Sequence, residues 1–65
     1  MNEGDIVMIY HDPISRTTPE GHAKLLAKKG FCGVHEGHPL ELWSVMFLAD
    51  SFQGTKLIIN TEKRL

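Results

Sequence analysis

Hydrophobic residues in this chain gather in short runs that polar, glycine-containing stretches separate. The first run, residues 5–11, reads DIVMIYH and is rich in β-branched and apolar residues. Because it is also too short for a typical helix, it predicts a β-strand. The strand is expected to end at Asp12-Pro13, since proline cannot donate a hydrogen bond to a central strand ladder. Residues 14–19 (ISRTTP) are polar and turn-prone and predict a loop.

Two later runs predict an antiparallel hairpin. Residues 40–49 (LELWSVMFLA) form the clearest strand, residues 50–54 (DSFQG) a turn, and residues 55–60 (TKLIIN) the returning strand. Alternation along the first of these strands places Trp43, Val45 and Phe47 on one face and Leu42, Ser44, Met46 and Leu48 on the other. Trp43 is expected in the core, where small domains place their largest side chains.

Residues 19–30 (PEGHAKLLAKKG) are compatible with a helix or a strand. Thr18 as N-cap, Pro19 at the first helical position and Gly30 beyond the end are helix signals. In a strand, small and apolar residues at 23, 25 and 27 alternate with polar residues at 22, 24 and 28. Local signals slightly favour the helix, and both alternatives stay open at this point.

The order of the elements resembles the small SH3-like β-barrels. The resemblance covers most of the chain and lies in a glycine-led first strand (EGDIVMIY), a polar loop, PEGHAKL, then LWSVMFL, a tight turn and LIIN. It implies that residues 22–29 are the second strand. We therefore expect a single all-β domain over residues 1–65, an SH3-like small barrel of four to five antiparallel strands. The alternative is an α+β domain of β-α-β-β order with a helix at 18–29.

The resemblance does not extend to recognition of proline-rich peptides. SH3 domains with that activity carry an acidic loop after the first strand and paired tryptophans in the next hairpin. Here the corresponding loop holds only Asp12 and Glu20 as acidic residues, and Trp43 is the sole tryptophan.

The charge balance argues against tight nucleic-acid binding. Seven Lys and Arg residues oppose eight Asp and Glu residues, a formal net charge of −1, whereas phosphate recognition usually requires a basic excess. A nucleic-acid-binding barrel would depend on Lys24, Lys28, Lys29 and Lys56. No apolar run approaches the length of a membrane span and no signal peptide is seen, so we expect a cytoplasmic protein without membrane contact.

Cys32, His35 and His38 are the strongest candidates for chemistry. Their C-x2-H-x2-H spacing offers three zinc ligands, but a structural site needs four, and His11 or His22 would have to complete it. A catalytic Cys32 would need a base held against it. We interpret residues 31–39 as a glycine-rich polar loop and expect no metal, no cofactor and no catalytic residue. A zinc-binding module remains the last alternative.

The strands are apolar on both faces, which predicts contact with another chain. A second apolar face is expected around Leu42, Met46 and Leu48, together with Val7 and Ile9. Aromatic residues at strand ends and in loops add to the predicted contact set, which is Tyr10, Phe31, Leu42, Met46, Leu48 and Phe52. The function expected from the sequence is a non-enzymatic interaction or accessory module that binds another protein chain or itself.

Overall fold

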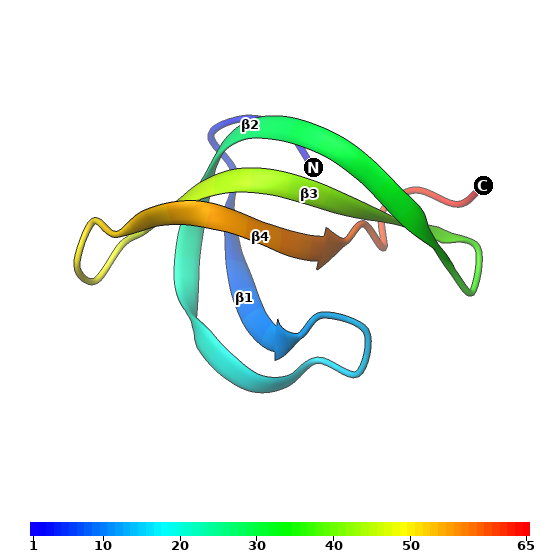
Figure 1. Cartoon of the computed structure of the whole chain (residues 1–65), viewed down its shortest axis with the longest axis horizontal. Helices are drawn as coiled ribbons and strands as arrows, with labels where there is room; N and C mark the ends of the chain where they lie inside the picture. Colours follow the sequence, from blue (N-terminus) through cyan, green and yellow to red (C-terminus); the bar gives the residue numbers. More distant parts are fainter.

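Four antiparallel strands form a single curled sheet, a half-barrel without helices (Figure 1). The computed structural model describes all residues, 1–65. The strands are β1 (Ile6–Asp12), β2 (Thr17–His35), β3 (His38–Phe47) and β4 (Gln53–Ile59), in the sheet order β1-β2-β3-β4. The all-β prediction is confirmed, and the curled four-stranded sheet is consistent with an SH3-like barrel.

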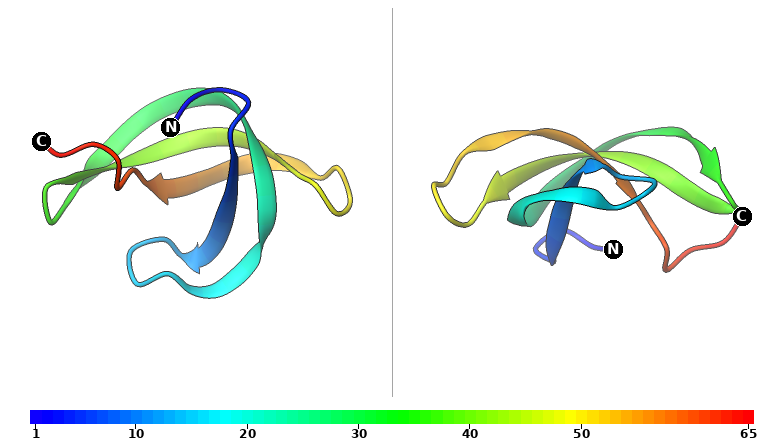
Figure 2. Two further views of the ribbon diagram at one scale, coloured as in Figure 1. Left: turned by 180° about the vertical axis from the view of Figure 1, so that it is seen from behind. Right: turned by 90° about the horizontal axis from the view of Figure 1, so that it is seen from below.

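The long strand β2 bends and thereby belongs to both halves of the molecule (Figures 1 and 2). Its first part pairs with β1 and its second part with β3. The register with β3 shifts at three places, between Leu25 and Ala27, Lys28 and Gly30, and Phe31 and Val34. Such irregularities bend a strand and increase its twist. The bent 19-residue strand β2 therefore curls the sheet.

The helical alternative for residues 18–29 is wrong. Ala23 pairs with Val7 on one side and with Phe47 on the other, and Leu25 pairs with Val45. Ala23 and Leu25 are completely buried. Pairing on both sides of the strand therefore satisfies its backbone and buries its apolar residues, which outweighs the local helix signals.

The core lies on the concave side of the sheet. It consists of six buried residues, Ile9, Ala23, Leu25, Trp43, Val45 and Ile58. Met1, Val7 and Phe47 pack against them. The placement of Trp43 in the core is confirmed, since its exposed fraction is 3%.

The predicted second apolar face is wrong in part. Ile9 is buried in the core with Trp43, and Val7 packs against that core. The curl of the sheet turns this side of β1 toward the concave side. Val7 and Ile9 therefore do not share a face with Leu42 and Met46, which alternate with the buried positions of β3.

Residues 31–39 are not a loop, as the sequence had suggested. β2 continues to His35 and β3 begins at His38, so that only Glu36 and Gly37 connect them. Both residues have positive φ, 50° and 81°. This is the two-residue turn whose twist matches that of the flanking strands. The glycines of this segment therefore serve a tight hairpin and its register shifts.

We expect Gly37→Ala to destabilise the protein by about 1–2 kcal/mol, the usual cost of a left-handed conformation for a residue with a Cβ atom. The added Cβ would also lie 2.8 Å from Arg64 Nη1. Gly30→Ala is the matched control, because Gly30 lies in the same hairpin, has no positive φ and has open space around it. Urea unfolding should separate the two variants, and equal midpoints would contradict this prediction.

The two termini cover the concave side without pairing with the free edges of the sheet. Near the N-terminus, Gly4 N donates to Leu25 O, and the Met1 ammonium lies 3.5 Å from Glu62. The C-terminal segment turns back to the β2–β3 hairpin, where Leu65 N donates to Gly37 O. β1 and β4 consequently remain the edge strands of the sheet. The chain contains no helix that could cross a membrane.

Candidate functional site

An apolar groove runs along the free edge of β4, opposite the β1–β2 hairpin. Two hollows of about 300 Å³ and about 270 Å³ adjoin there. Tyr10, Pro13 and Leu57 line both hollows. We call the two hollows together the β4-edge groove. In Figure 1, β4 crosses in front of β1, and the hairpin that forms the opposite wall hangs below it.

The β1–β2 turn holds the opposite wall in place. The Asp12 carboxylate accepts hydrogen bonds from the backbone N–H groups of Ile14 and Ser15, at 3.0 and 3.2 Å. Arg16 N donates to Asp12 O at 2.9 Å. The bonds from Ser15 and Ile14 lower the pKa of Asp12. Because this network fixes the turn, Pro13 and Arg16 on either side of it are held against the groove.

A bulge in β2 brings charged residues to the far end of the groove. The register shift between Ile9 and Tyr10 gives β2 one extra residue, Glu20, next to Gly21, whose φ is 134°. Glu20 accepts from Lys56 Nζ of β4 at 2.9 Å, and His11 Nδ1 lies 3.9 Å from it. The Lys56–Glu20 pair thus connects the wall of the groove to β4.

Arg16 is the cation of the groove that has no acidic partner. It lines the larger hollow, and the four ion pairs of the structure involve other residues. The other charged residue of that hollow, Glu62, faces the Met1 ammonium. The groove therefore combines a larger hollow lined mostly by apolar residues with a smaller one lined by a higher share of polar residues, and Arg16 is its unpaired positive charge at the β1–β2 turn.

The predicted contact residues do not form one surface. Tyr10 and Leu42 line the β4-edge groove. Leu48 and Phe52 line a separate open recess of about 490 Å³ beside the β3–β4 turn, where the Phe47 and Phe52 rings are 6.3 Å apart. Met46 and Phe31 line neither, and Phe31 is 57% exposed on the second half of β2.

Sequence reasoning missed Pro13, Arg16 and Leu57 of the groove. Pro13 and Arg16 belong to a polar turn that had no feature to distinguish them. Leu57 begins the apolar run LII, and the run alone does not indicate which of its residues lies at a free edge. The open edge of β4 depends on where β1 and the C-terminal segment lie, which local patterns do not specify.

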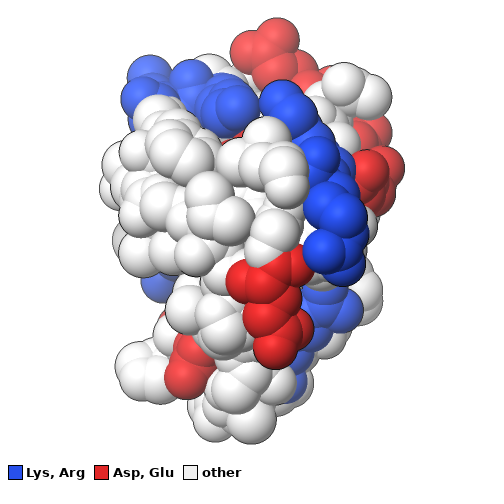
Figure 3. All heavy atoms as spheres, turned by 90° about the vertical axis from the view of Figure 1, so that its right-hand side faces the viewer, with Lys and Arg blue, Asp and Glu red and all other residues white.

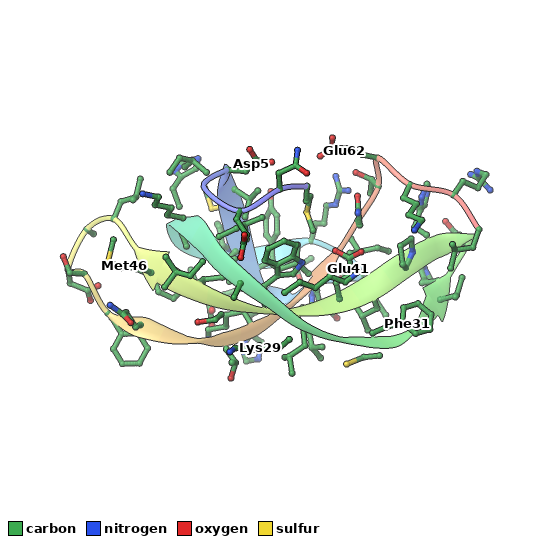
Figure 4. The ribbon with its side chains drawn as sticks, turned by 90° about the horizontal axis from the view of Figure 1, so that it is seen from above. Asp5, Lys29, Phe31, Glu41, Met46 and Glu62 are labelled. Carbon is green, nitrogen blue, oxygen red and sulfur yellow. The ribbon has the colours of Figure 1, made fainter.

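A buried carboxylate on β3 is a second feature that the sequence did not indicate. Glu41 is 2% exposed and lies on the concave side, toward the termini that carry Asp5 and Glu62 (Figure 4). It accepts hydrogen bonds from Trp43 Nε1 at 2.9 Å and Asn60 Nδ2 at 3.3 Å, and Lys28 Nζ lies 3.2 Å away. Burial alone raises the pKa of Glu41, but these three partners outweigh it and lower the pKa.

This network holds parts of the fold together. Asn60 follows β4, Lys28 belongs to β2, and Glu41 and Trp43 belong to β3. The carboxylate therefore fixes the core tryptophan and the end of β4 at the same point. All of its polar neighbours have partners, which is the arrangement expected of a structural buried charge.

Cys32, His35 and His38 do not converge. His35 and His38 are cross-strand neighbours at the hairpin turn, and His38 Nδ1 lies 2.7 Å from Lys63 O. Cys32 is an exposed free thiol in the irregular part of β2. No group of three or more His, Cys, Asp and Glu side chains is arranged to hold a metal ion.

The lysines do not gather into a broad basic patch. Lys28 and Lys56 are engaged with Glu41 and Glu20, which leaves Lys24 and Lys29 without acidic partners. Lys29 lies on the convex side in Figure 4. Figure 3 shows that Lys and Arg side chains form a narrow band, with acidic side chains adjoining it and a broad uncharged area beside it.

Comparisons with protein-family models, with curated proteins and with solved structures found no match to this chain.

Proposed function

We propose that this protein is a small non-enzymatic interaction module that binds another protein chain in the β4-edge groove. The observation that carries the proposal is the apolar groove beside a strand edge without a partner. Exposed strand edges are places where another chain adds to a sheet. The exposed free thiol of Cys32 fits a reducing compartment such as the cytoplasm.

The side chains that line the groove are suited to protein recognition. Tyr10 and Leu57 are partly exposed, and Leu57 shows 39% of its surface. Tyrosine offers a large apolar ring together with a hydroxyl that can form hydrogen bonds, and it is enriched where proteins bind one another. Pro13 adds a rigid apolar surface without a donor N–H that would need a partner.

The alternative classes have less support. For nucleic-acid binding, ion pairs neutralise two of the four lysines that the sequence had suggested, Lys28 and Lys56. For zinc binding, the candidate ligands do not form a cluster. Self-association would need the same exposed apolar positions as binding of another chain, and the experiment below distinguishes the two by the mass of the adduct.

Site-specific photocrosslinking in the source cells tests the proposal. A benzophenone amino acid at position 57 is expected to form a discrete adduct with one protein, while the same group at position 6, an exposed apolar site outside the groove, forms none. The purified partner should bind the Tyr10→Ser variant at least about tenfold more weakly than the wild type. Identical adduct patterns at both positions would contradict a binding site in the groove.

A further inference from the structure

The free edge of β4 presents backbone groups that no other segment of the chain uses. In an antiparallel sheet, alternate residues of an edge strand direct their N–H and C=O groups away from the neighbouring strand. β3 occupies one side of β4. Outside the strand ladders, no backbone hydrogen bond involves any residue from Gln53 to Ile59. The groove therefore has a polar backbone edge along one wall.

The opposite wall restricts what can reach this edge. Tyr10 and Pro13 line both hollows together with Leu57, so β4 faces the β1–β2 hairpin across the groove. An extended segment is the kind of occupant that pairs with a strand edge through its backbone. A second copy that brought its own β4 edge would offer no acidic residue to Arg16, since Gln53–Ile59 contains neither Asp nor Glu.

We infer that the β4-edge groove binds an extended segment of a partner protein, which pairs with β4 as an additional strand of the half-barrel. This inference rests on the proposed function and specifies its binding mode. Main-chain hydrogen bonds to β4 supply affinity, and alternate side chains of the segment supply specificity. The side chains that point into the groove contact Tyr10, Pro13 and Leu57 and are therefore apolar.

Arg16 determines the charge of the partner segment. Arg16 lines the larger hollow, and its guanidinium has no acidic partner in the structure. Guanidinium groups bind carboxylates through paired, charge-assisted hydrogen bonds. The segment accordingly carries an Asp, a Glu or a terminal carboxylate at the end that lies near the β1–β2 turn.

Selection from a phage-displayed library of random peptides of about seven residues, the length of an ordinary strand, tests this inference on the full chain. The expected result is a set of peptides in which apolar residues alternate with polar ones and an acidic residue lies at one end. Binding of a synthetic selected peptide should fall at least about tenfold with Leu57→Lys and with Arg16→Glu. Leu48→Lys and Arg64→Glu are the matched controls and should retain binding, since neither residue lines the groove.

Methylation of peptide nitrogens distinguishes strand pairing from other modes. In a paired strand, only alternate N–H groups of the peptide face β4. N-methylation at one alternate set of positions should abolish binding, while methylation at the other set should leave binding nearly unchanged. Circular dichroism of each variant ensures that lost binding does not reflect unfolding.

The possible failures have different meanings. Peptides whose binding needs Leu57 but whose residues show no apolar–polar alternation would overturn strand pairing, and so would peptides that tolerate methylation at either set of positions. Both results would leave the proposed interaction module in place. A library that yields no peptide, or peptides insensitive to Leu57→Lys, would overturn both. A dimer of the protein alone in sedimentation, lost in Leu57→Lys, would identify a second copy as the occupant and overturn the inference.

Discussion

Replacing Trp43 with alanine is expected to leave the protein largely unfolded under native conditions. Truncation of a large buried aromatic residue costs about 3–5 kcal/mol. Trp43 is 3% exposed and belongs to a core of only six buried hydrophobic residues. A 65-residue domain has a small total stability, so this single loss removes most of it. The variant also deprives Glu41 of one hydrogen-bond donor.

Far-ultraviolet circular dichroism and urea unfolding would measure the effect. Phe31→Ala is the matched control, because Phe31 is also aromatic and lies in the same sheet but is 57% exposed. The control should unfold close to the wild-type midpoint. A Trp43→Ala protein with wild-type cooperativity and midpoint would show that the ring does not hold the core together.

Replacing Glu41 with alanine should have the second largest effect, a destabilisation of about 2–5 kcal/mol. Without the carboxylate, Trp43 Nε1 and Asn60 Nδ2 lose their acceptor in a buried region, and each unsatisfied donor costs about 1–3 kcal/mol. Lys28 contributes less, since its side chain is 47% exposed and can turn to water. Glu41→Gln keeps the size and one acceptor oxygen and should be destabilised less.

The pKa of Glu41 also predicts how stability depends on pH. Because hydrogen bonds and Lys28 lower the pKa of the folded-state carboxyl, the ionised group stabilises the folded state. This contribution is fully present above the ordinary glutamate pKa of about 4.3 and is lost as the pH falls through the lower folded-state pKa. Urea midpoints measured from neutral pH to about pH 3 should therefore decrease for the wild type.

Two variants test which carboxylate causes this loss of stability at low pH. Glu41→Gln cannot ionise and should show a weaker decrease than the wild type over the same range. The pKa of Asp12 is lowered as well, by the backbone bonds from Ser15 and Ile14, so Asp12→Asn should remove a further part. A Glu41→Gln protein with the full acid dependence would contradict the assignment to the buried carboxylate.

Alternation of apolar and polar residues was enough to identify three strands and one turn. The runs 5–11, 40–49 and 55–60 each overlap an observed strand, and the predicted turn 50–54 overlaps the β3–β4 connection, which lies at residues 48–52. The position of Trp43 in the core also followed from the sequence, because a small domain has few places for its largest ring. Of the groove, the sequence indicated Tyr10 and Leu42, whose role in binding stays a prediction.

Tertiary pairing decided the features that local patterns left open or described wrongly. Residues 19–30 form a strand because β1 pairs with the segment up to Lys24 and β3 pairs with it from Ala23 onward, whereas its own residues slightly favour a helix. Residues 31–39 form a hairpin because the strands continue to Glu36 and Gly37. The strand at 19–30 depends on partners elsewhere in the sequence, which no local pattern contains, whereas the hairpin at 31–39 pairs residues that are close in the sequence, such as Val34 and Pro39.

The sequence by itself determined which residues share a face within β1, β3 and β4, since side chains alternate with a period of two along a regular strand. Only the tertiary structure decided which face is concave, because that depends on how the irregular strand β2 bends the sheet. The bend buries Ile9 with Trp43, encloses Glu41 beneath the termini, and sets the β1–β2 hairpin opposite the free edge of β4. The groove exists for the same reason: its two walls are separate in sequence and meet only when the sheet curls.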